Sequence, residues 1–128
     1  MVIIGAGPGG YEAASVAAAG GVEVTVVEET GIGGAAVLTD CVPSKTLIAT
    51  AEVTSTLRRA AELGLRHTET FEVDLDAVNF RVRQLAQAQS DDISRGLERK
   101  GVRLISGRAR LATGAPGHLH RVVINDDE

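Results

Sequence analysis

The chain has 128 residues and a mass of 13.3 kDa, which is enough for one domain of ordinary size but not for two. Lys and Arg total 13 and Asp and Glu total 17, so the formal net charge of −4 argues against a general nucleic-acid-binding protein. No apolar run approaches the roughly 18 residues of a membrane span, and no charged leader precedes the first apolar segment. Its single cysteine, Cys41, has no partner for an internal disulfide. With 44% hydrophobic residues, the composition predicts a packed, soluble and cytoplasmic domain.

The first part of the chain has the pattern of a strand–turn–helix–strand unit. Residues 1–4 form a short apolar run that glycines interrupt, which predicts a fully buried strand of a parallel sheet. Helix-forming residues follow over 11–19, and Gly20 is expected to end that helix. Residues 22–27 are mostly apolar or β-branched and predict a second buried strand. We therefore expect a right-handed crossover between two parallel strands.

The second part of the chain predicts two helices followed by a small hairpin. A loop that contains several glycines is predicted over 30–35, and residues 36–48 have no assigned structure. Helices are predicted over 51–63 and 77–100, and strands over 102–105, 109–111 and 119–124. Both helix predictions are based on apolar residues at helical spacing, and Gly101 is expected to end the second helix. The pattern over 71–75 is ambiguous and is compatible with an extended segment. The predicted hairpin turn contains Gly114, Pro116 and Gly117.

Residues 5–10, G-A-G-P-G-G, fit the pattern G-x-G-x-x-G between a strand and a helix, which is the context of a dinucleotide site. In that interpretation Gly5 permits the tight turn, Gly7 lets the backbone approach a pyrophosphate, and Gly10 allows the helix to pack closely on the strand. Pro8 belongs to the same segment. The start of the helix offers free N–H groups and a partial positive charge to a diphosphate. The alternative is an ordinary tight turn, which the combination of strand, glycines and helix disfavours.

An acidic residue is expected about 20 residues after the glycines, where it accepts hydrogen bonds from ribose hydroxyls. Glu28 lies 18 residues after Gly10 and directly follows the second predicted strand. Glu29 is the competing candidate. We favour Glu28 because it ends the strand, whereas the position of Glu29 is more typical of a solvated loop charge.

Residues 33–45, G-G-A-A-V-L-T-D-C-V-P-S-K, resemble the active-site segment of the flavoprotein disulfide reductases. These class I pyridine nucleotide-disulfide oxidoreductases include dihydrolipoamide dehydrogenase, glutathione reductase and mercuric reductase. Their pattern is G-G-T-C-x-x-x-x-C-x-P-S-K, in which two cysteines form a redox disulfide beside the flavin. This chain keeps the second cysteine as Cys41 but has Ala36 at the position of the first. That change, with the run over 31–37, resembles the NAD(P)H quinone reductase subgroup.

The resemblance implies an α/β fold, namely a Rossmann-like FAD-binding domain with a parallel sheet, crossover helices and a small β-hairpin insertion. It also implies that residues 1–128 are an N-terminal, partial FAD-binding domain. The NAD(P)H-binding domain and the C-terminal dimerisation domain of the family would then lie outside this chain. The whole protein is expected to be a homodimer.

The resemblance also implies a set of site residues. FAD is expected to contact Gly5, Gly7, Pro8, Gly10, Glu28, Gly33, Gly34, Ala35, Cys41, Lys45 and Ala109. Lys45 corresponds to the family lysine near flavin N5, where a cation favours the anionic reduced flavin. A solvated surface lysine is the alternative, but the position of Lys45 in the matching motif favours the functional role. For Cys41 a thiolate beside the flavin and a buried, inert thiol remain equal alternatives. Asp40 is interpreted as a helix cap, and His67, His118 and His120 have no metal-ligand spacing.

The function expected from these features is that of an FAD-dependent NAD(P)H oxidoreductase. NAD(P)H, the co-substrate, would reduce the flavin, and the flavin would then reduce a quinone-like acceptor without a redox disulfide. One alternative is disulfide or lipoamide reduction, with the missing thiol supplied by another segment. A second alternative is a non-catalytic module that only binds a dinucleotide.

Overall fold

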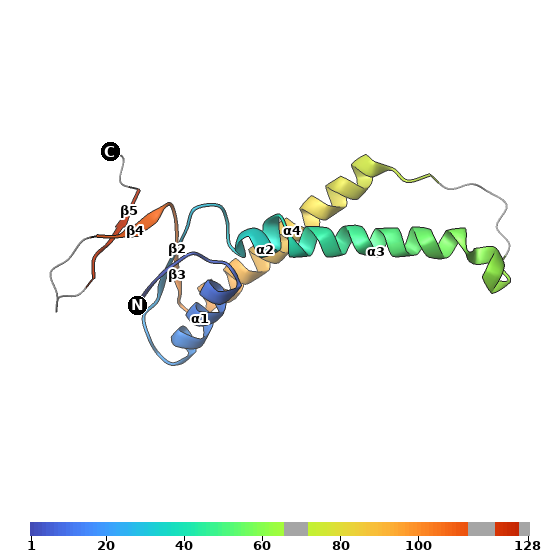
Figure 1. Ribbon diagram of the computed structural model, residues 1–128. Helices are drawn as coiled ribbons and strands as arrows, with labels where there is room; N and C mark the ends of the chain where they lie inside the picture. The colour runs from blue at the N-terminus through green and yellow to red at the C-terminus, as the bar shows by residue number, and fades with distance from the viewer. Residues whose placement is uncertain (66–71, 113–119, 126–128) are drawn as a thin grey trace.

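A computed structural model describes residues 1–65, 72–112 and 120–125 of the chain, and Figure 1 shows the arrangement of its helices and strands. The elements, in chain order, are β1 (Val2–Ile4), α1 (Pro8–Ala19), β2 (Thr25–Glu28), α2 (Gly34–Leu38), α3 (Cys41–Arg58), the short 3₁₀ helix η1 (Ala60–Leu63), α4 (Leu75–Arg99), β3 (Arg103–Ser106), β4 (Ala109–Leu111) and β5 (Val122–Ile124). Helices separate the parallel strands from β1 to β3, so the predicted α/β class with a parallel sheet is confirmed.

The parallel sheet has the strand order β1-β2-β3. Its register pairs Ile3 with Val26, and Val26 with Leu104. The central strand carries the core, since Val26 is fully buried in a cluster with Ala14 of α1 and Leu97 of α4. The core therefore lies where α1 and α4 pack against β2, and α1 forms the crossover that the strand–helix–strand pattern predicts.

The prediction that the first strand is fully buried is wrong. Val2 is 48% and Ile4 is 46% exposed, whereas Ile3 between them packs against the core. Alternate side chains of a strand point to opposite faces of the sheet, so Ile3 lies on the face that packs against the core, and Val2 and Ile4 lie on the opposite face, where they remain exposed. The second strand begins at Thr25, because residues 22–24 carry the chain from the end of α1 back to the sheet.

Helix α3 begins well before the predicted segment at 51–63, since its first residue is Cys41. Pro43 lies in the first turn, where an N–H has no intrahelical acceptor, so the proline does not interrupt the helix. The stretch over 36–48 that had no assigned structure is therefore divided between α2 and α3. The helix ends at Arg58, and η1 follows it.

Helix α4 agrees closely with the predicted helix over 77–100. Asp74 caps its N-terminus, and the Asp74 carboxylate accepts a hydrogen bond from the Ala77 N–H at 2.9 Å. The extended interpretation of residues 71–75 is wrong at Leu75, where α4 begins; residues 72–74 form neither helix nor strand, and residue 71 lies outside the described residues. α3 and the first half of α4 pack side by side and extend away from the sheet (Figure 1).

β4 and β5 form a two-stranded antiparallel hairpin in which Ala109 lies opposite Ile124. β4 has the predicted bounds, whereas β5 begins at Val122 rather than at residue 119. The predicted turn residues Gly114, Pro116 and Gly117, together with His67 and His118, lie outside the described residues.

Candidate functional site

The glycine-rich loop, residues 5–10, joins β1 to α1 and brings the helix and the strand into close contact. Gly5 has a φ of +93°, which the turn at the end of β1 requires. A Cβ at Gly10 would stand 1.9 Å from the carbonyl oxygen of Gly5, so this position admits no side chain. Gly5 is thus required by its backbone conformation, and Gly10 by the close packing of α1 on the end of β1.

Gly7 is different. Its φ of −66° is one that any residue adopts. Apart from its chain neighbours, no heavy atom of the described residues lies within 4 Å of the point where a Cβ at Gly7 would stand. The first intrahelical bond runs from Tyr11 N–H to the Gly7 carbonyl, so the amides of Gly9 and Gly10 precede it. Open space and helix-start donors therefore meet at Gly7, where an anionic group can approach the backbone.

Glu28 ends β2 and its carboxylate bonds to two loops. The Ala6 N–H donates to Oε2 at 2.7 Å, and the Thr30 N–H and hydroxyl both donate to Oε1 at 2.8 Å. Partial burial raises the pKa of Glu28, but the hydrogen bonds from Ala6, Thr30 and Gly31 outweigh it, so the pKa lies below its ordinary value. The bracing of the glycine-rich loop by Glu28 is a role that the sequence motif did not indicate.

The loop before α2 packs directly on the glycine-rich loop. Gly33 N–H donates to the Ala6 carbonyl at 2.8 Å. A Cβ at Gly34 would stand 3.0 Å from the Cα of Gly7, so the two backbones meet without side chains between them. Both Gly33 and Gly34 have positive φ. The sequence analysis placed Gly33 and Gly34 in the site, and the structure brings them to the glycine-rich loop.

A pocket of about 310 Å³ lies beside Glu28, at the carboxyl ends of β2 and β3. It is lined by Glu28, Glu29, Thr30, Gly31, Ile32, Leu104, Ile105 and Ser106. Ligands of open parallel sheets bind at this edge. The β3 residues and Thr30 were missed by sequence reasoning, although the parallel pairing of two predicted strands would have placed their carboxyl ends together.

The residues of the Cys41 segment lie at the start of α3. The five-residue helix α2 joins Gly34 to this segment, and Ala35 and Ala36 lie on it. Cys41 is exposed, so the alternative of a buried thiol is wrong in this chain. Lys45 follows Cys41 by one helical turn, on the same side of α3, and is also exposed.

Two further residues are placed by the structure. Asp40 is the N-cap position of α3, as interpreted, but its side chain makes no capping hydrogen bond and instead accepts one from the Thr39 hydroxyl. Ala109 lies on β4 and not among the pocket residues. The neighbouring Gly107 N–H donates to the Glu28 carbonyl at 2.8 Å, which ties the start of the hairpin to the end of β2.

A protein-family model described as pyridine nucleotide-disulphide oxidoreductase matches residues 1–123. The chain belongs to this family. The resemblance based on residues 33–45 is thereby confirmed, as is the Rossmann-like fold class. Among the described residues, no helix has the length and apolar character needed to cross a membrane, and no group of three His, Cys, Asp or Glu side chains is placed to hold a metal ion.

Several relatives in this family are similar to the chain. A Mycobacterium tuberculosis protein named NAD(P)H dehydrogenase (quinone) is 49% identical over 121 residues, which cover 91% of this chain and 24% of that protein. The dihydrolipoyl dehydrogenase of Chlamydia muridarum is 36% identical over 110 residues, or 86% of this chain and 23% of that protein. The chain thus spans about a quarter of the length of these relatives.

Solved structures show the same similarity. The crystal structure of LpdA from Mycobacterium tuberculosis matches with a TM-score of 0.85 and 47% identity, over 94% of this chain and 26% of that chain. RclA from Escherichia coli, described as an HOCl-induced flavoprotein disulfide reductase, matches with a TM-score of 0.66 and 22% identity, over 84% of this chain and 21% of that chain. At that identity RclA supports the fold alone.

Proposed function

We propose that the chain is part of the FAD-binding domain of an NAD(P)H oxidoreductase that reduces a quinone-like acceptor without a redox disulfide. One observation carries this proposal: Cys41, at the start of α3, is a free and exposed thiol, and alanine occupies position 36 of α2, where the family pattern has the other redox cysteine. Within the whole protein, which we propose to be a cytoplasmic homodimer, the NAD(P)H-binding and dimerisation domains would lie outside residues 1–128.

The geometry around the glycine-rich loop fits FAD. The open backbone at Gly7 and the amides of Gly9 and Gly10 would hold the diphosphate, with Gly34 beside them. The Glu28 carboxylate accepts hydrogen bonds from Ala6, Thr30 and Gly31, and a ribose hydroxyl would bind it by sharing or replacing one of these donors. The pocket beside Glu28 would take the adenosine end, with Gly33, Ala35, Pro8 and Ala109 as the remaining proposed contacts.

When bound, FAD would supply the chemistry that accepts a hydride from NAD(P)H and passes electrons on. The residues of this chain would contribute by placing charge beside the cofactor and by holding it in position. Lys45 would place a cation beside the ring, where it stabilises negative charge that develops on reduction. Cys41, one turn away on α3, would line the same site with its thiol.

The choice of acceptor follows from sulfur chemistry. Reduction of lipoamide requires exchange with an enzyme disulfide, and exchange needs two sulfurs within bonding distance. Cys41 is the single cysteine of this chain, whereas a quinone accepts electrons from a flavin directly. The relative named NAD(P)H dehydrogenase (quinone), at 49% identity, supports this acceptor.

The second candidate is dihydrolipoyl dehydrogenase activity. It is favoured by the retained segment C-V-P-S-K over 41–45 and by the relatives with that name at 36% identity. It requires that a thiol from outside this chain pairs with Cys41. A non-catalytic dinucleotide-binding module is the third candidate, and turnover of NAD(P)H by the whole protein would exclude it.

An anaerobic reductive titration of the whole protein separates the first two candidates. We expect uptake of about two electrons per FAD, quinone reductase activity and negligible lipoamide turnover. The Cys41→Ser variant should show the same uptake, because Cys41 stores no electrons without a partner. Uptake of about four electrons by the parent, falling to about two in Cys41→Ser, would instead establish a disulfide with an outside thiol and contradict the proposal.

A further inference from the structure

The buried face of α4 contains a serine among apolar residues. Val82, Ala86 and Leu97 are buried on this face, and Ser90, at the same helical spacing, is only 5% exposed. A buried hydroxyl is costly unless it is hydrogen-bonded. The Ser90 hydroxyl donates to the backbone carbonyl of Ile32 at 2.6 Å, across 58 residues of sequence.

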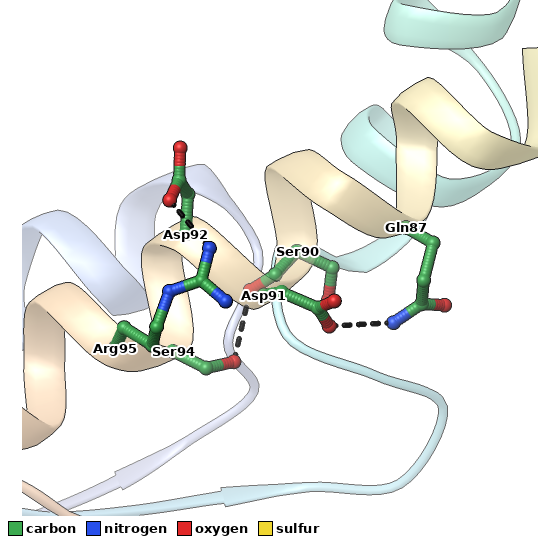
Figure 2. Close-up of polar contacts among 6 residues, drawn as sticks. All are labelled: Gln87, Ser90, Asp91, Asp92, Ser94 and Arg95. Atoms are coloured by element: carbon green, nitrogen blue, oxygen red, sulfur yellow. Dashed lines mark hydrogen bonds and ion pairs between the residues drawn. The ribbon is translucent and has the colours of Figure 1, made fainter.

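The polar side chains around Ser90 make contacts of a different kind. Figure 2 shows Gln87 bonded to Asp91 and Arg95 bonded to Asp92, which are exposed pairs within one or two turns of α4. The Ser94 hydroxyl donates to the Ser90 carbonyl at 2.9 Å, again within the helix (Figure 2). Ser90 therefore acts between elements, whereas Ser94, one turn away, acts within α4.

Ile32 belongs to the loop that packs on the glycine-rich loop. Directly after it, Gly33 bonds to the Ala6 carbonyl and Gly34 contacts Gly7. A continuous path of short contacts thus runs from the Ser90 hydroxyl through residues 32–34 to Gly7. Nothing in the glycines themselves restricts this loop to one conformation, since glycine populates many. Ile32 also packs against the core cluster that contains Leu97 of α4, but the hydrogen bond from Ser90 is directional and fixes the position of the Ile32 carbonyl.

We propose that Ser90 is a positioning residue for the diphosphate-binding part of the site. Its hydroxyl fixes the Ile32 carbonyl and thereby holds Gly33 and Gly34 against the glycine-rich loop in the geometry that receives the anionic group. This inference rests on the proposed function, because it takes FAD as the ligand. Without the hydroxyl, the loop has to be ordered when FAD binds, and affinity falls.

Binding of FAD to the whole apoprotein tests this proposal, with Ser90→Ala as the variant and Ser94→Ala as its matched control. We expect the FAD dissociation constant to rise about tenfold in Ser90→Ala and to stay near the parent value in Ser94→Ala. Ser90→Thr keeps the hydroxyl and should restore most of the affinity. Ser90→Cys, which keeps the volume but donates weakly, replaces the alanine variant if that protein does not fold.

Amide hydrogen exchange in the FAD-free protein gives the second measurement. The amides of Gly33 and Gly34 should exchange faster in Ser90→Ala, while those of the β2 core keep their protection. Unchanged FAD affinity together with unchanged exchange at Gly33 and Gly34 would overturn the proposal, and so would equal effects of Ser90→Ala and Ser94→Ala. If the parent binds no FAD, the proposed function fails, and the exchange experiment still decides whether Ser90 holds the loop.

Discussion

The sheet end of the molecule and its two-helix arm are built differently. In the sheet end, which comprises β1–β3, α1 and the loops around Glu28, backbone meets backbone and the central valines are buried, although the outer residues Val2, Ile4 and Val16 are exposed. The arm comprises α3, η1 and the first half of α4 and extends away from the sheet (Figure 1). Large apolar side chains remain exposed on it; Val53 is 61% and Phe80 is 56% exposed.

The difference indicates which part of the chain is held in place by contacts within residues 1–128. At the sheet end, Gly10 packs against Gly5 within its own loop, whereas Gly33 and Glu28 each bond to Ala6 of that loop, so contacts within residues 1–128 hold the loops of the candidate site together. In the arm, α3 and α4 contact each other along one side, and an apolar groove of about 490 Å³ runs between them, lined by Leu47, Val78 and their neighbours. Substitutions should therefore have large effects at the sheet end and small ones in the arm.

The largest effect is expected at Gly10. In Gly10→Ala the new methyl would stand 1.9 Å from the Gly5 carbonyl oxygen, which the loop cannot accommodate, so we expect a loss of about 3 kcal/mol or more of folding free energy. Gly7→Ala is its matched control. Its φ suits alanine and the space is open, so stability should hold or rise by about 0.4–1 kcal/mol while FAD binding weakens.

Chemical unfolding and FAD titration of the two variants measure these effects. Normal FAD binding by Gly7→Ala would show that the space before Gly7 does not receive the diphosphate. A stable, FAD-binding Gly10→Ala protein would contradict the close contact between α1 and the end of β1.

The next effect compares two valines. Val26→Ala removes fully buried methyl groups from β2 and should cost about 2–3 kcal/mol. Val53→Ala changes an exposed side chain of α3 and should change stability by less than about 0.5 kcal/mol. Urea unfolding of both variants in the whole protein gives the comparison. An equal loss would show that a part of the protein outside this chain covers the arm.

The sequence predicted the sheet end better than the arm, and the reason is local chemistry. Gly5 and Gly10 have positions that sterics dictate, so their pattern indicates both the turn and the crossover. The sequence analysis missed the start of α3. A proline usually indicates that no helix runs through its position, and Pro43 is compatible with a helix because it lies in the first turn. The exposure of β1 depends on which strands and helices pack beside it, and the apolar residues of the strand do not indicate these neighbours.

The site itself was predicted in part. Glu28 was predicted to be a ribose ligand, and that role stays a prediction. Its hydrogen bonds to Ala6 and Thr30 depend on how two loops meet, which the spacing of the motif does not indicate. Ser90 was not considered, although a serine at a core position of a helical stripe is a signal that sequence alone provides. The pocket residues of β3 required the strand order.

The smallest expected effect concerns Glu28 and pH. Its lowered pKa means that the folded form gives up the proton more readily than the unfolded chain, so its contribution to stability is complete above the ordinary glutamate value of about 4.3 and is lost as the pH falls below it. Glu28→Gln should therefore cost about 1 kcal/mol at pH 7, a modest value because the carboxylate is partly exposed, and the difference should shrink in acid. Glu29→Gln removes the same charge and serves as the control.

Unfolding at pH 7 and in acid, with FAD retention measured alongside, checks this expectation. FAD retention should fall in Glu28→Gln and remain near the parent level in Glu29→Gln. Equal losses from the two substitutions would refute the assignment of Glu28 as the ribose ligand.

We propose that the loops around Gly7, Glu28 and Gly34 bind FAD. The most direct measurement is to purify the whole protein without added cofactor, denature it and identify the nucleotide that it releases. We predict FAD, at close to one molecule per chain. Release of NAD without any flavin, from protein that has not lost its cofactor, would contradict the claim.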